Sequence, residues 1–321
     1  MPLVNLKNLF NKNKNVRNPI SPYNQDLPSS NRYTNSLDLS SNIVDVNITL
    51  NKVDISSHAQ KDKIVIIYTY FKSPVADYNL TFFSRRELTY KENIDYVIVI
   101  NGYTCDILFP RIANLTILKR ENVGYDFGGH NEAIQYLKSK GLTYKYYFFM
   151  NSGVFGPIMP AYITEHWSEI FIKKLIGLVK IVGTSIVCLR KDDLGGFGPK
   201  VEGFFFLTDS IGLGLLLEEE TVFCNHVDKK AAIIDGEYGL TKCIMKHGYT
   251  IDCMIQRYNG VDWYDKRNWN INNNKHPTRK NDYFGKSINP YEVIFHKWYW
   301  EGKDLVNYDI VKHYVEQTVL A

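Results

Sequence analysis

The sequence predicts an α/β fold in which helices flank a mainly parallel central sheet. Runs of β-branched and aromatic residues with the length of a strand, such as 64–71 and 95–103, are typical of strands buried on both faces. Between such runs the apolar residues recur with helical spacing, as in 129–141. Because the two patterns alternate along the first half of the chain, a parallel sheet covered by helices is expected.

The predicted elements follow one another from residue 63 onward. In the first half we expect a strand at 64–71, a helix at 74–88, strands at 95–103 and 113–122, a helix at 129–141 and a strand at 144–151. In the second half we expect strands at 180–189 and 201–209, a helix at 210–220, a helix from about Glu237 to His247 with a strand after it, loop over 259–290, and a helix around 304–320.

Composition limits the class of protein. The chain has 321 residues and a net charge of +4, with no clustered basic face, so no nucleic-acid partner is expected. The start of the chain lacks the apolar region of a secretory signal, and the apolar stretch 175–189 is short and contains Lys180, so no membrane span is expected. Five cysteines without Cys-x-x-Cys spacing favour reduced thiols and a cytoplasmic location, the host cytoplasm if the chain is viral.

Polar corners follow four of the predicted strands. They lie at Thr69-Tyr70, at Asn101-Gly102, from Asn122 to Gly129, and from Asn151 to Gly153. In an open parallel sheet a ligand binds beyond the carboxyl ends of the strands. We therefore expect these corners to meet along one rim.

Three glycines, 124, 128 and 129, lie between a predicted strand and a predicted helix. Without a Cβ they let a ligand approach the backbone, and a helix N-terminus presents free N–H groups to an anion. Tight packing of the strand against the helix, with no ligand, explains the same glycines. Their spacing matches neither the dinucleotide-binding fingerprint nor a P-loop.

Four segments together resemble the family 2 glycosyltransferases. "NVGYDFGGHNEAI" (122–134) followed by "MNSGVFGP" (150–157) is most similar to the rhamnan synthesis F group. Downstream, "VEGFFFLTD" (201–209) and "GEYGLTKCIMKHGY" (236–249) match the family's apolar strand and catalytic helix in order. The resemblance covers roughly residues 63–300.

The resemblance implies a GT-A-like, Rossmann-like fold with a single large domain at 61–300, divided into a nucleotide-binding half (61–157) and an acceptor half (158–300). A polar N-terminal arm with an edge strand at 43–55 would occupy 1–60, and a C-terminal helix 301–321. The resemblance also implies transfer of a sugar, such as rhamnose or another deoxyhexose, from a UDP-, dTDP- or GDP-linked donor to a glycan acceptor. The configuration at the anomeric carbon would be inverted. The oligomeric state is not predicted.

The resemblance assigns roles to particular residues. Glu237 takes the place of the catalytic base, with Asp235 as the second choice. We expect Glu237 to begin a helix, where the helix dipole would lower its pKa. Trp298 and Trp300 are candidates for acceptor stacking. The residues expected to hold the nucleotide sugar are Thr69, Tyr70, Asn101, Asn122, Gly124, Asp126, Gly129, Asn131, Asn151, Ser152 and Gly153.

One departure from the family concerns the metal. The family's Asp-x-Asp triplet, which binds the Mn²⁺ or Mg²⁺ of the donor, is Asn151-Ser152-Gly153 here, and these ions prefer anionic oxygens. Three explanations stay open: Asp126 or His296 holds the metal, side chains neutralise the diphosphate, or the protein is inactive. The rival functions are accordingly an inactive nucleotide- or glycan-binding module and a sugar nucleotidyltransferase.

Overall fold

The computed structural model describes residues 62–300 and 304–319. Contacts divide the chain into Met1–Gln60 and Lys61–Ala321, and the second unit is described below. The predicted N-terminal arm and the edge strand at 43–55 lie outside the described residues.

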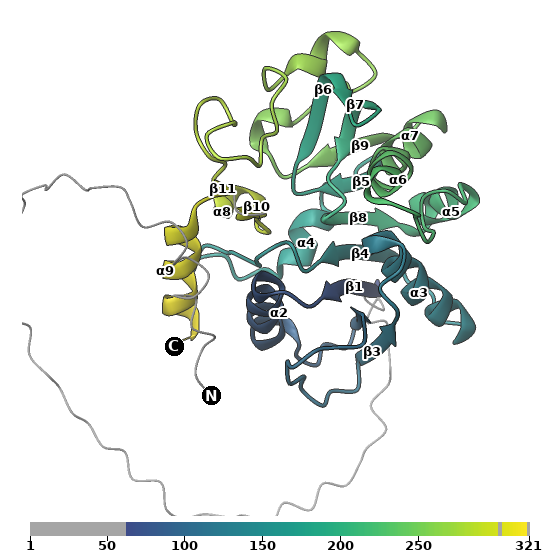
Figure 1. Ribbon diagram of the computed structural model, residues 1–321, viewed down its shortest axis with the longest axis vertical. Helices are drawn as coiled ribbons and strands as arrows, with labels where there is room; N and C mark the ends of the chain where they lie inside the picture. Colours follow the sequence, from purple (N-terminus) through teal and green to yellow (C-terminus); the bar gives the residue numbers. More distant parts are fainter. Residues whose placement is uncertain (1–61, 301–303, 320–321) are drawn as a thin grey trace, which may run out of the picture. The chain divides into compact units, whose positions relative to one another are not determined.

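A seven-stranded mixed sheet forms the centre of the fold (Figure 1). Its order is β3-β2-β1-β4-β8-β5-β9, and β8 runs antiparallel to both of its neighbours. The strands are β1 (Ile64–Phe71), β2 (Ile94–Asn101), β3 (Leu115–Arg120), β4 (Tyr146–Asn151), β5 (Val179–Gly183), β8 (Phe205–Asp209) and β9 (Thr250–Cys253). The predicted mainly parallel α/β sheet is therefore confirmed.

The register aligns the strand ends. Thr69 in β1 pairs with Asn151 in β4, and Phe71 in β1 pairs with Asn101 in β2. Because β8 is antiparallel, its amino end lies at this same edge, where the backbone N–H of Asn151 donates to the carbonyl of Phe204 (3.0 Å). The polar corners thus share one rim of the sheet, as the sequence predicts.

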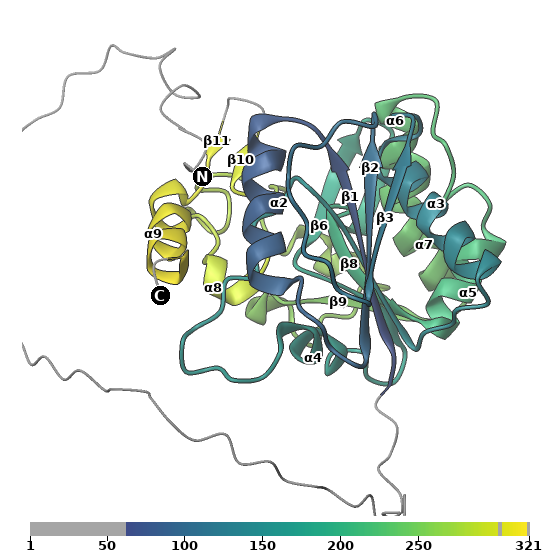
Figure 2. The ribbon, with the colours of Figure 1, turned by 90° about the horizontal axis from the view of Figure 1, so that it is seen from below.

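Helices cover both faces of the sheet (Figure 2). One face carries α2 (Pro74–Glu87) and α4 (Trp167–Ile172), and the other carries α3 (Tyr125–Ser139), α5 (Ser210–Glu218) and α7 (Tyr238–Lys246). Alternation along β1 sends Ile64 and Ile66 into one apolar core and Val65 and Ile67 into the other.

The second half of the chain adds smaller elements around the sheet. Strands β6 (Ile186–Asp193) and β7 (Gly196–Val201) form a hairpin, and α6 (Lys229–Ala231) continues through the π-helix η1 (Ala232–Glu237) into α7. The 3₁₀ helix η2 (Gln256–Tyr258) precedes the predicted loop at 259–290, and the 3₁₀ helix η3 (Lys266–Asn270) interrupts it. Then follow α8 (Pro290–Val293), β10 (Tyr299–Trp300), β11 (Asp304–Leu305) and α9 (Tyr308–Val319).

Two predicted elements differ from the structure. Helix α3 begins at Tyr125, so Gly128 and Gly129 lie inside its first turns instead of in a turn before it. The single strand expected at 180–189 is two strands, β5 and β6, that pair in different sheets. None of the helices within the described ranges is long and apolar enough to cross a membrane.

Candidate functional site at the carboxyl edge of the sheet

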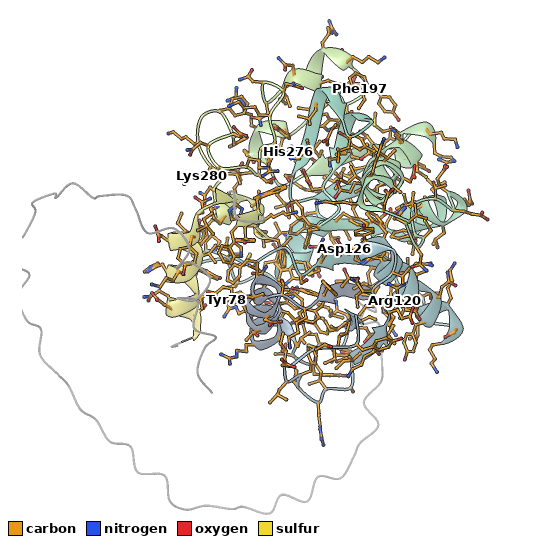
Figure 3. The ribbon with its side chains drawn as sticks, viewed as in Figure 1. Tyr78, Arg120, Asp126, Phe197, His276 and Lys280 are labelled. Carbon is orange, nitrogen blue, oxygen red and sulfur yellow. The ribbon has the colours of Figure 1, made fainter. Side chains whose placement is uncertain are left out.

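Asn151 and Asp126 form the corner where β4 meets α3. The Asn151 Nδ2 donates to Asp126 Oδ2 (2.6 Å), and Asn151 Oδ1 accepts from the backbone N–H of Gly153 (2.8 Å). Burial raises the pKa of Asp126, whereas Asn151, Lys297 and Thr69 oppose this rise. Figure 3 labels Asp126 close to the middle of the sheet. The corner is thus a carboxyl group held by an amide.

The glycines of this region are explained by contacts within the chain. Gly124 has φ +76°, a left-handed conformation that glycine adopts without strain, and a Cβ there would lie 2.4 Å from the Cα of Asn225. A Cβ on Gly129 would lie 2.6 Å from Thr69 Cγ2. Tight packing, the ligand-free interpretation of these glycines, therefore accounts for both positions.

A second charged cluster lies beside this corner. Lys200, at the end of β7, is only 3% exposed, and its Nζ lies 2.5 Å from Glu237 Oε2 and 3.7 Å from Asp193 Oδ2. Burial lowers the pKa of Lys200, but the negative charges of Glu202 and Glu237 outweigh this effect and raise it above its ordinary value. Lys200 therefore stays charged in a site largely removed from water.

The two glutamates around Lys200 have opposite pKa shifts. Burial raises the pKa of Glu202, but Lys200 and His276 outweigh burial and bring it down to about 2. Burial and the charge of Glu202 raise the pKa of Glu237, while Lys200 opposes them. One carboxylate therefore stays ionised, and the other has an increased affinity for a proton.

The structure corrects the expected setting of Glu237. Helical structure begins at Lys229, so Glu237 lies at the junction of η1 and α7 and not at a helix N-terminus. Its pKa is raised and not lowered, because burial and Glu202 dominate. A Cβ on Gly203 would lie 2.8 Å from the Cγ of Glu237. Glu237 therefore packs against Gly203, which lies just before Phe204 and the amino end of β8. This brings Glu237 to the same rim as Asn151. Asp235, the second candidate base, is solvent-exposed on the same π-helix.

Lys297 and His276 come from the loops that follow β9. His276 Nδ1 lies 3.3 Å from Glu202 Oε1, although the two atoms are not in hydrogen-bonding orientation. The Lys297 Nζ lies 4.2 Å from the ring centroid of Trp300 and 5.2 Å from that of Phe204. Trp300 is half-buried and also contacts Arg279, whose guanidinium lies 3.9 Å from its ring centroid.

Trp298 and His296 belong to the interior. Trp298 is 0% exposed, donates from Nε1 to Asn79 Oδ1 (3.0 Å) and stacks on Tyr308, so its ring presents no surface to an acceptor. His296 is also buried, pairs through its backbone with Phe155, and has a pKa lowered by burial to about 4. Within the described residues no carboxylate pairs with His296.

The predicted nucleotide residues divide between the two faces. Thr69 contacts Gly129 of α3, whereas the hydroxyl of Tyr70 bonds to Asp77 of α2 on the opposite face. The Oδ1 of Asn101 accepts from Arg120 Nη1 (3.0 Å), and the backbone N–H of Ser152 donates to Thr69 (2.9 Å). Two others lie outside this network: Asn122 is exposed, and Asn131 accepts from Gln135 farther along α3.

The donor set at the corner does not fit a divalent metal. Asp126 is the carboxyl group that contacts Asn151, and both polar atoms of the Asn151 amide already have partners within the chain. Mg²⁺ and Mn²⁺ require several oxygen ligands, mostly anionic. Across the described ranges, no group of three His, Cys, Asp or Glu side chains is arranged to hold a metal.

Sequence reasoning missed Lys200, Glu202, His276 and Lys297. A signal was present for Lys200 and Glu202, because these charged residues interrupt a run whose other residues predict a buried strand. Buried charges require partners, so this alternation indicates an internal ion-pair cluster. No comparable signal marks His276 or Lys297.

Comparisons with known proteins give limited information. No family model matches the chain, and no curated protein matches it. Among solved structures, the mannosyltransferase PcManGT from Pyrobaculum calidifontis, in complex with GDP-Man and Mn²⁺, has 13% identity and a TM-score of 0.39, over 61% of this chain and 55% of that chain. The glycosyltransferase GlyE of Streptococcus pneumoniae TIGR4 has 10% identity and a TM-score of 0.38, over 79% and 60%. This chain thus spans less than two thirds of either protein, and similarity at this level carries no argument about activity.

Proposed function

We propose that the chain is an inverting glycosyltransferase that moves a sugar from a nucleotide-sugar donor to a glycan acceptor, with Glu237 as the general base. The observation that carries the proposal is the position of Glu237. This carboxylate has a raised pKa and lies on the rim of the sheet that also holds Asn151 of β4 and Asp126 of α3. Segments distant in sequence thus supply a base and a polar corner to one edge.

The step needs a base on one side of the anomeric carbon. The acceptor hydroxyl gives its proton to Glu237 as its oxygen bonds to that carbon, and the bond from carbon to the diphosphate oxygen breaks with its electron pair on the diphosphate. Lys200 holds the Glu237 carboxylate at 2.5 Å. It thereby orients the base, since a lysine that is 3% exposed and paired has little freedom to move.

The pKa values favour Glu237 over Glu202 for this role. A base is most effective when its proton affinity lies near the working pH, and the pKa of Glu237 is shifted upward whereas that of Glu202 is about 2. Glu202 is also 3% exposed, beyond the reach of an acceptor hydroxyl. Its negative charge serves to raise the pKa of Glu237.

The test is a panel of UDP-, dTDP- and GDP-sugars assayed for transfer and hydrolysis. We expect Glu237→Gln to lower kcat by about 100- to 10,000-fold with nucleotide binding retained. Asp235→Asn is the matched control, since Asp235 is exposed on the same π-helix. Loss of activity in Asp235→Asn with retention in Glu237→Gln would reverse the assignment.

A binding module without turnover is the second candidate. It is favoured by the observation that the glycines and the Asn151 amide at the rim already have partners within the chain. Such a module would bind a nucleotide or glycan yet leave every donor of the panel intact.

The donor sugar and the location extend the proposal. A rhamnose nucleotide is the first donor to test, because the resemblance to the rhamnan synthesis F group favours a deoxyhexose. All five cysteines are free thiols. This is consistent with a cytoplasmic location.

A further inference from the structure

We infer that Lys297, in place of a divalent cation, supplies the positive charge opposite the departing diphosphate. The inference rests on the proposed function, since it assigns the leaving-group side of that reaction. A transferase needs positive charge or hydrogen-bond donors where negative charge develops. The corner that would hold a metal offers one carboxyl group, Asp126, and an amide whose two polar atoms are already bonded.

Backbone pairing brings Lys297 to this corner. The chain after β4 pairs with the segment before β10, because Phe155 and His296 exchange hydrogen bonds of 3.0 and 2.8 Å. His296 and Trp298 are buried while Lys297 between them is partly exposed, as alternation in an extended segment requires. Its ammonium lies 5.2 Å from the ring of Phe204, whose carbonyl binds the N–H of Asn151.

The ammonium of Lys297 faces acidic groups but is paired with none of them. Its positive charge acts on the pKa of Asp126, Glu202 and Glu237, lowering each of them. In the part of the chain that the structure describes, no carboxylate oxygen lies within 4.0 Å of it. Its ammonium lies 4.2 Å from the ring centroid of Trp300 and 5.2 Å from that of Phe204. Such ring contacts use none of its three N–H donors, which stay available to an anion.

Lys200 cannot take this part. It is 3% exposed and bound to Glu237 at 2.5 Å, so its charge is already matched inside the protein. The two lysines therefore have separate tasks: Lys200 positions the base, and Lys297 meets the ligand. A lysine acts toward phosphate as a mobile point charge, which suits a group that must neutralise charge as a bond breaks.

The test measures binding of inorganic pyrophosphate, UDP and GDP by titration calorimetry, in EDTA and again with Mn²⁺. We expect binding in EDTA that Mn²⁺ leaves unchanged. Lys297→Met should weaken it about 10- to 100-fold, the usual effect of losing one charged hydrogen-bond donor. Lys140→Met is the matched control, because Lys140 is an exposed lysine over the ring of Tyr136 at the opposite end of α3.

Circular dichroism of Lys297→Met, and a second variant, Lys297→Gln, separate loss of the charge from loss of the fold. Three results overturn the inference: binding that appears only with Mn²⁺, no binding of any probe, or equal affinity in wild type and both Lys297 variants. If metal-free binding depends on Lys297 but no donor of the panel turns over, the proposed function fails and the anion site remains.

Discussion

The burial of His130 predicts how the free energy of unfolding changes with pH. Its side chain is 0% exposed on α3, packed edge-on against the rings of Phe127, Phe149 and Phe206, and neither ring nitrogen has a hydrogen-bond partner among the described residues. Burial lowers its pKa from 6.5 to about 3. The folded protein therefore keeps this histidine neutral at pH values where the unfolded chain binds a proton.

The free energy follows from proton linkage. Stability is unaffected above pH 6.5 and falls as the pH drops toward 3, because only the unfolded state gains the proton. At pH 5 the loss from His130 is about 2 kcal/mol. His296, with a pKa of about 4, contributes a further loss of about 2 kcal/mol at that pH. Together the two histidines account for about 4 kcal/mol between pH 8 and pH 5.

The assay is urea unfolding at pH 8 and pH 5, at constant ionic strength, for wild type and His130→Leu. Leucine has a similar volume and does not titrate, so the variant should lose about 2 kcal/mol less than wild type over this interval. His313→Gln is the control, because His313 is exposed on α9. An equal loss in wild type and His130→Leu would refute the conclusion that buried His130 stays neutral.

Three further predictions follow from single contacts. Glu202→Gln should shift the acidic limb of the kcat/KM profile to lower pH, because Glu202 raises the pKa of Glu237; an unchanged or upward-shifted limb would contradict this. Gly129→Ala should destabilise the fold by about 1–3 kcal/mol in urea unfolding, since its Cβ would meet Thr69, whereas Gly214→Ala in α5 meets nothing within 4 Å and should stabilise it. Trp298→Phe should cost about 1–3 kcal/mol by leaving the Oδ1 of Asn79 without its donor in the interior, with kcat unchanged; a fall in kcat at full stability would return Trp298 to the acceptor site.

The sheet was predictable where the signal is local. The runs that form β1, β2 and β4 are buried on both faces, and such runs are visible in sequence. The start of α3 was not predictable in this way. Gly128 and Gly129 are poor helix formers and read as a turn, yet they lie in the helix because it packs closely against Thr69 and Asn225. Close tertiary packing overrides local propensity there.

The candidate site was predictable only in part, because its charges interact across distant segments. Asn151 and Asp126 lie near each other in the sequence, and the family resemblance pointed to Glu237. The sign of the pKa shift at Glu237 could not be inferred, since it depends on burial in the folded protein and on the charge of Glu202, which follows strand β7.

The arrangement of the charges separates the roles of the two glutamates more firmly than their positions in sequence do. Glu202 is buried beside His276, and its pKa of about 2 leaves it almost no affinity for a proton near neutral pH. Glu237 has the same lysine as a neighbour, yet it retains partial exposure and a raised pKa. A general base must be accessible to the acceptor hydroxyl and must have a sufficient affinity for its proton. Glu237 meets both conditions, and Glu202 meets neither.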